Sequence, residues 1–288
     1  GRLLWEVPTA EKYRTPVPIW GLASNPLIAA GNLIVQVGGA NGACMVAFDP
    51  VTGDERWRAL DDEASYSAPV LINQAGKEVL VCWTGGSITG LDPASGRIFW
   101  TLPFEPRNMI MNVADPVYDP PYLFLSAFYD GSYLVELDQE KLSARIVYHR
   151  IGKNERETDA LHCCISTPFI RNGYVYGIDS YGEARCLELI TGERIWEDFS
   201  LVPRGRWANV HLVQQDELTW GFNENGELLL GRFTPEGYTG LGRVSVIDPV
   251  RISPNPRNGV CWAHPAFSGD RVFLRSDAKV VCIRIHSR

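Results

Sequence analysis

Short apolar runs separated by turn-forming residues recur along the whole chain, and none of them shows sustained helical periodicity. Between Thr167 and Trp196, for example, four such runs follow one another, at 167–170, 174–178, 184–189 and 194–196. Asn172-Gly173 separates the first two runs. This pair is typical of a two-residue β-hairpin, because a type I′ turn needs positive φ at both central positions. The pattern predicts a unit of four short antiparallel strands.

A sequence motif shows that this unit repeats. The motif, small residue-x-acid-x-x-Thr/Ser-Gly-x-x-x-Trp, occurs at 47–57, 90–100 and 186–196. The interval between the second and third copies is about twice the interval between the first and second. Glu136-Leu137-Asp138 lies midway and marks a further copy that has lost the Gly and the Trp. A weaker fifth copy spans 229–237, and a sixth is divided between the chain ends, at 281–284 and 1–5.

The start of each repeat carries a second periodic signal. A polar or small residue followed by Pro precedes the first apolar run at Asn25-Pro26, Ala68-Pro69, Asp115-Pro116, Thr167-Pro168 and His264-Pro265, and His211 replaces the Pro in the fifth repeat. Proline is tolerated at the first residue of a strand, so these positions mark the start of the first strand of each repeat.

Repeats of four strands predict an all-β fold: a six-bladed β-propeller of four-stranded antiparallel blades, forming a single domain over residues 1–288. The motif Trp is expected to lie over the turn of the next blade, against the Gly that permits close approach. Because the sixth copy is divided, we expect Arg2–Glu6 to be the outer strand of the last blade, whose inner strands come from 271–285. The alternative is a fragment of a longer propeller protein with further blades before Gly1.

The motif at 47–57 resembles the tryptophan-docking repeat of the pyrroloquinoline-quinone (PQQ)-like β-propellers. That superfamily includes quinoprotein alcohol dehydrogenases and the propeller lipoprotein of bacterial outer-membrane barrel assembly. Val260–Phe267 is similar to the end of uncharacterised bacterial propellers of the PQQ-binding-like type. The resemblance implies a bacterial protein that is periplasmic or otherwise extracytoplasmic. It implies little about activity, because the motif residues are structural.

Composition narrows the range of partners. The net charge of −7 argues against nucleic acid, whose backbone is bound by clustered Lys and Arg. No apolar run is long enough to span a bilayer, so no transmembrane segment is expected.

The adjacent Cys163 and Cys164 are the feature that the resemblance links to a cofactor, since quinoprotein dehydrogenases hold a disulfide between adjacent cysteines against PQQ. Adjacent side chains in an extended strand point to opposite faces, which favours two separate thiols; whether they form a disulfide is left open. The family's calcium ligands and catalytic Asp find no match in this sequence. We therefore expect neither PQQ nor calcium and no catalytic residue. A PQQ- or metal-dependent oxidoreductase is the alternative.

Two other groups have metal-binding chemistry. His162, His211 and His264 lie at or near strand starts and could bind a metal. They belong to three different repeats without ligand spacing, which favours hydrogen-bonded structural histidines. The acidic run Asp61-Asp62-Glu63 offers oxygen ligands for calcium, but a solvated loop is the favoured interpretation.

The strand starts of a propeller gather around one mouth of its axial funnel, and such loop-proximal positions often carry function. We therefore predict a ligand or partner site made by Asn112, Asp159, His162, Trp207 and His264. Trp207 would be its energetic anchor. These polar and aromatic side chains suit a protein, peptide or carbohydrate. The predicted function is binding or scaffolding without catalysis.

Overall fold

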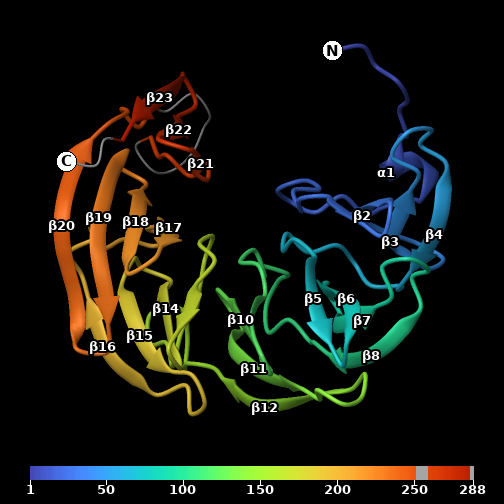
Figure 1. Ribbon diagram of the computed structural model, residues 1–288, viewed down its shortest axis with the longest axis horizontal. Coiled ribbons are helices and arrows are strands. Elements are labelled where there is room, and N and C mark those ends of the chain that lie inside the picture. Colours follow the sequence, from blue (N-terminus) through green and yellow to red (C-terminus); the bar gives the residue numbers. More distant parts are fainter. Residues whose placement is uncertain (251–258, 286–288) are drawn as a thin grey trace. The chain divides into compact units, whose positions relative to one another are not determined.

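The computed structural model describes residues 1–250 and 259–285, whose regular secondary structure is almost entirely β-strand (Figure 1). The one helix among them, α1 (Thr9–Lys12), has four residues. No helix in the described part of the chain is long and apolar enough to cross a membrane. The chain forms two compact units, Gly1–Asn154 and Glu155–Arg288.

The first unit contains three antiparallel sheets, each of four strands in sequence order. The first sheet consists of β1 (Leu27–Ala29), β2 (Asn32–Gly39), β3 (Ala43–Phe48) and β4 (Glu55–Ala59). The second consists of β5 (Val70–Gln74), β6 (Lys77–Trp83), β7 (Ser87–Leu91) and β8 (Ile98–Pro103). The third consists of β9 (Val117–Asp119), β10 (Tyr122–Ala127), β11 (Gly131–Leu137) and β12 (Ala144–Arg150). This third sheet confirms the copy that has lost its Gly and Trp.

The second unit also contains three antiparallel sheets. One consists of β13 (Phe169–Arg171), β14 (Tyr174–Ile178), β15 (Ala184–Glu188) and β16 (Arg194–Asp198). The next consists of β17 (Val210–Gln215), β18 (Leu218–Asn223), β19 (Glu227–Thr234) and β20 (Gly237–Ser245). The last has three strands, β21 (Ala266–Ser268), β22 (Arg271–Arg275) and β23 (Val280–Arg284). The prediction of four antiparallel strands per repeat is thus confirmed for five of the six sheets.

The acid and the glycine of the motif shape the turn between the third and fourth strands. Asp49 Oδ1 accepts hydrogen bonds from the backbone N–H groups of Val51 at 2.7 Å and Thr52 at 3.1 Å. These bonds favour the charged carboxylate and hold the pKa of Asp49 below its usual value. Gly53 has φ of 78°, a left-handed conformation that side chains disfavour.

Two tryptophans of the first unit, Trp5 and Trp57, pack on the turn of the sheet that follows them. The indole Nε1 of Trp57 donates to the carbonyl oxygen of Pro93 at 3.2 Å, and its ring lies against Gly96. Trp5 repeats this arrangement, with a 3.1 Å bond to Pro50 O and its ring against Gly53. Each indole thus packs the segment that carries it against the turn of the sheet that follows.

The expectation that Arg2–Glu6 is a strand is not met, and its pairing with 271–285, which lies in the other unit, stays a prediction. Arg2–Glu6 forms no strand, and the sheet β21–β23 has three strands in the part of the chain that the structure describes. The ring contact and indole hydrogen bond of Trp5 nevertheless hold the segment on the 49–54 turn, as those of Trp57 hold the paired strand β4 on the next turn.

Candidate interaction site

Of the five residues predicted to form the binding site, Asn112 lies in the first unit and the other four lie in the second. Asn112 and His162 are buried, Asp159 and Trp207 are partly exposed, and His264 is exposed. In the second unit, His162 and Trp207 donate backbone N–H hydrogen bonds to the turn 179–183, which joins β14 to β15, and Asp159 lies on the same loop as His162. His264 lies instead against His211.

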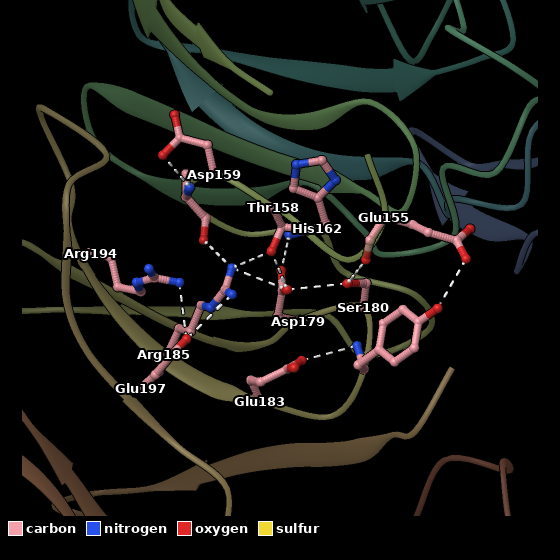
Figure 2. A network of polar contacts seen from close by, with 12 residues as sticks. Glu155, Thr158, Asp159, His162, Asp179, Ser180, Glu183, Arg185, Arg194 and Glu197 are labelled. Atoms are coloured by element: carbon pink, nitrogen blue, oxygen red, sulfur yellow. Dashed lines mark hydrogen bonds and ion pairs between the residues drawn. The ribbon is translucent and has the colours of Figure 1, made fainter. Parts of the chain in front are cut away.

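A buried ion pair between Arg185 and Asp179 is central to this cluster (Figure 2). Arg185 Nη1 is 3.1 Å from Asp179 Oδ2, and the two side chains are 5% and 1% exposed. Arg185 Nη2 also lies 3.4 Å from Glu197 Oε2 on β16. Loss of one member of such a pair leaves an uncompensated buried charge, so both members are strongly constrained.

The ion pair fixes the loop 155–162 that precedes β13. Arg185 Nη1 donates to Thr158 Oγ1 at 2.8 Å and to the carbonyl oxygen of Ala160 at 2.9 Å. Asp179 accepts from the backbone N–H of His162 at 2.6 Å and from the Thr158 hydroxyl at 2.7 Å. These contacts hold Ala160 at φ of 52°, in the left-handed region. The partly exposed Asp159 is therefore carried on a loop that buried charges keep in place.

Trp207 is attached to the same turn. Its backbone N–H donates to the carbonyl oxygen of Ser180 at 3.0 Å. Its φ of 65° is rare for so bulky a residue. The guanidinium of Arg206 lies 4.5 Å from the ring centre, within range of a cation–π interaction. Backbone strain of this kind clusters at functional sites, so Trp207 is kept as a candidate site residue.

Two exposed arginines flank Trp207. Arg206 Nη2 pairs with Glu155 Oε2 at 2.7 Å, and the other oxygen of Glu155 accepts from the Tyr181 hydroxyl at 3.1 Å. Arg204 Nε pairs with Glu183 Oε1 at 2.8 Å. The arginine side chains are 60% (Arg204) and 43% (Arg206) exposed, whereas Glu183 is 4% exposed. Less exposed carboxylates thus orient solvent-facing guanidinium groups. We refer to Tyr181, Arg204, Arg206 and Trp207 as the Arg–Trp surface.

His211 and His264 form a separate contact in the second unit, with ring centres 3.8 Å apart. His211 Nε2 is 2.8 Å from the carbonyl oxygen of Trp262 and therefore carries the proton of the neutral ring. Burial lowers the pKa of His211 to about 3, with a smaller effect from His264. The ring is neutral at physiological pH, as expected for a hydrogen-bonded structural histidine.

Asn112 stabilises backbone in the first unit. Its side-chain Nδ2 donates to the carbonyl oxygens of Trp83 at 3.3 Å and Thr84 at 3.1 Å, and its backbone carbonyl oxygen accepts from the N–H of Tyr66. With its side chain fully buried, Asn112 joins the end of β6 to the segment before β5.

The residues that would hold a quinone cofactor do not fit one. Cys163 and Cys164 are both buried and are not joined by a disulfide. Across residues 1–250 and 259–285, no three His, Cys, Asp or Glu side chains are grouped as metal ligands. The acidic run before β5 serves local structure, since Asp61 Oδ1 accepts from the N–H of Gly42 and Asp62 Oδ2 accepts from the hydroxyls of Thr84 and Ser87.

Reasoning from the sequence overlooks the charged members of the cluster, Asp179, Glu183, Arg185, Arg204 and Arg206. One signal in the sequence could have revealed this cluster. Arg185 interrupts the apolar run 184–189, and a charged residue inside a buried strand requires a partner. The identity of that partner depends on how distant segments meet, which no local pattern contains.

Comparison with known proteins agrees with this architecture. The PQQ-like repeat β-propellers are built from successive antiparallel sheets that carry this repeat. The family model described as "Outer membrane protein assembly factor BamB" matches residues 1–198, and the chain belongs to this family. The outer membrane protein assembly factor BamB of Yersinia pestis is 24% identical in an alignment 243 residues long that covers 80% of this chain and 58% of that protein. The chain therefore spans well under two thirds of this relative's length.

Solved structures share the fold at low sequence identity. BamB from Moraxella catarrhalis superposes with a TM-score of 0.51 at 17% identity, over 91% of this chain and 84% of that one. The computationally designed Ika8 protein gives 0.59 at 12% identity, over 91% and 70% of the two chains. Quinohemoprotein alcohol dehydrogenase from Comamonas testosteroni gives 0.52 at 13% identity, over 88% and 51%. These similarities concern the fold alone.

Proposed function

We propose that this chain is a non-catalytic, protein-binding β-propeller that acts outside the cytoplasm. Its two units would form one domain of six blades, with tryptophan docking between blades. Six antiparallel sheets in sequence order, the family and the name of the Yersinia pestis relative support this proposal. The partner would be a protein of outer-membrane assembly or one of its protein substrates.

The Arg–Trp surface is the observation that carries the proposal. Trp, Tyr and Arg are the residue types most enriched at the energetic centres of protein interfaces. Here the two arginines are oriented by Glu155 and Glu183, and the loop behind them is fixed by Arg185. Side chains that are already ordered lose little conformational entropy on binding.

The five residues predicted from the sequence take two roles in this proposal. Asp159, Trp207 and His264, which are exposed or partly exposed, would contact a partner. Asn112 and His162 are buried and would shape the backbone nearby. We propose no role for PQQ, calcium or another metal, since Cys163 and Cys164 are not joined by a disulfide and the carboxylates of Asp61 and Asp62 accept hydrogen bonds from the protein itself.

Arrays of defined ligands test this function directly. The purified chain is applied to overlapping peptides from outer-membrane proteins and their assembly machinery, and to a glycan array. We expect selected peptides to bind and Trp207→Ala or Arg206→Ala to abolish the signal. Val51→Ser, which changes a side chain 73% exposed in the first unit, serves as the control. Binding to glycans alone, or peptide binding unaffected by the two variants, would contradict the proposal.

Saturable binding of PQQ in the presence of calcium would instead favour an oxidoreductase. Absorbance titration of the purified chain with both reagents provides this second measurement.

A further inference from the structure

The two carboxylates beside the Arg–Trp surface are turned inward. Both oxygens of Glu155 are engaged, by the Tyr181 hydroxyl at 3.1 Å and by Arg206 Nη2 at 2.7 Å. Both oxygens of Glu183 are engaged as well, by Arg204 Nε at 2.8 Å and by the backbone N–H of Tyr181 at 3.1 Å. The two glutamate side chains are 21% and 4% exposed. The negative charge of this region is therefore used within the protein.

The guanidinium groups of the same region are turned outward. Arg204 is 60% exposed, and its one hydrogen bond or ion pair in the described part of the chain is that of Nε with Glu183. Its Nη1 and Nη2 groups therefore keep their N–H donors for an acceptor outside the protein. Arg206 is 43% exposed, and the exposed Arg156 extends the group, with Nε 3.2 Å from the Tyr181 hydroxyl. Outward cations thus gather at one place in a chain whose net charge is −7.

Aromatic rings lie beside these cations. Phe199, which follows β16, is 51% exposed, and its ring centre is 5.8 Å from the guanidinium carbon of Arg204. The ring centre of Trp207 is 4.5 Å from the guanidinium carbon of Arg206. A ring contacts the face of a guanidinium and leaves the donors on its edge, which match the two oxygens of a carboxylate. The region therefore combines apolar contact area with donors for an anion.

We propose that the partner of the Arg–Trp surface presents an acidic segment. Its carboxylates would accept hydrogen bonds from Arg204 and Arg206, and its neighbouring apolar side chains would pack on Phe199 and Trp207. Charge complementarity favours this occupant, because the exposed cations repel a basic segment and find no opposite charge on a neutral one. The inference rests on the proposed function, since it specifies the partner that this function requires.

A comparison of two forms of one peptide tests the inference on the wild-type chain. Overlapping peptides from outer-membrane proteins and their assembly machinery are first selected for binding that Trp207→Ala abolishes. Each selected peptide is then made in an amide form, with Asp replaced by Asn and Glu by Gln, and fluorescence anisotropy gives the Kd of both forms. We expect the acidic form to bind at least about tenfold more tightly, because the amide form cannot make the charge-assisted hydrogen bonds. The difference should shrink as NaCl is added.

Arg204→Gln connects this preference to the surface. It should weaken binding of the acidic form about tenfold and leave the Kd of the amide form unchanged. Arg284→Gln is the matched control, because Arg284 Nε also lies beside a carboxylate, 3.1 Å from Asp270 Oδ2, and its side chain is 54% exposed. This control should change neither Kd.

The opposite results are equally specific. Amide forms that bind as tightly as the acidic forms would overturn the inference and leave the proposed function standing, because binding would still depend on Trp207. An acidic preference that Arg204→Gln does not reduce would also overturn it. Binding of phosphatidylglycerol vesicles that Arg204→Gln abolishes, with no acidic preference among the peptides, would replace the protein segment by an anionic lipid. If no peptide depends on Trp207, the proposed function fails and this inference fails with it.

Discussion

Trp57 and Gly96 lie in contact between the first two sheets of the first unit. A Cβ atom added to Gly96 would lie 2.6 Å from Cε3 of the indole, closer than real carbon atoms approach. The bond from Trp57 Nε1 to Pro93 O, in the same turn, fixes the ring at this distance. The Gly and the Trp of the motif thus act as one contact contributed by two successive repeats.

Gly96→Ala should therefore be strongly destabilising. Gly76→Ala is a matched control, because Gly76 has φ of 72° against 73° for Gly96 and has no atom within 4 Å of its added Cβ. Both variants incur about 1–2 kcal/mol for the left-handed backbone. Gly96→Ala should lose a further 1–3 kcal/mol, roughly, through overpacking against the indole. Urea unfolding measures both losses, and equal losses would show that the contact contributes nothing.

In the copy of the motif at 136–138, which has lost its glycine, Gln74 connects the preceding motif tryptophan, Trp100, to the turn. Its Oε1 accepts from Trp100 Nε1 at 2.9 Å, and its Nε2 donates to Ser143 O at 2.7 Å and Asp138 O at 3.1 Å. Gln74→Leu should cost about 1–3 kcal/mol, because buried polar groups would lose their partner. Asn73→Leu, at the exposed neighbouring position, should change the urea midpoint little. Equal effects would contradict this role.

The buried ion pair of the second unit should contribute far more to the free energy of unfolding than the exposed ion pair beside it. Arg185→Met should cost roughly 3–5 kcal/mol, since it leaves the buried carboxylate of Asp179 without its cationic partner. Arg194→Met removes a pair with the same Glu197, but Arg194 is 41% exposed, so its loss should cost less than about 1 kcal/mol. Adding Asp179→Leu to Arg185→Met should recover part of the loss. If the double variant lost the sum of the free energies of unfolding lost by the two single variants, the two side chains would not interact.

His211 should make the folded state sensitive to acid. Its pKa of about 3 lies below that of an unfolded histidine, about 6.5, so the unfolded chain binds the extra proton between these values. Its contribution to stability is therefore lost as the pH falls from about 6.5 towards 3, by about 1.4 kcal/mol per pH unit. His211→Gln should unfold with a shallower pH dependence than the wild type between pH 7.5 and 5. Parallel pH profiles would contradict this assignment.

Several elements of the fold could be predicted from short-range chemistry. The Asp49 carboxylate, the left-handed Gly53 and Asn172-Gly173 shape their turns through bonds and backbone preferences within a few residues, so their strands follow from the sequence. The third sheet was predictable from spacing alone, although its motif is degenerate.

The candidate site was less predictable because it depends on contacts between distant segments. Trp207 was singled out from its place before a strand, but Arg185 and Asp179 meet the loop 155–162 only through the fold. The burial of Asn112 depends in the same way on the path of its loop.

The central claim, a protein-binding Arg–Trp surface, is tested most directly by photo-crosslinking in living cells. A photoreactive phenylalanine analogue replaces Tyr181, which is partly exposed and close to it in shape, and in a second strain it replaces the exposed Val51 as a control. The account predicts a specific protein adduct from position 181 that is absent from position 51 and that falls at least about tenfold when Trp207→Ala is added, since a tryptophan anchor contributes about 2 kcal/mol or more. Equal adducts from the two positions, or an adduct that Trp207→Ala leaves unchanged, would contradict it.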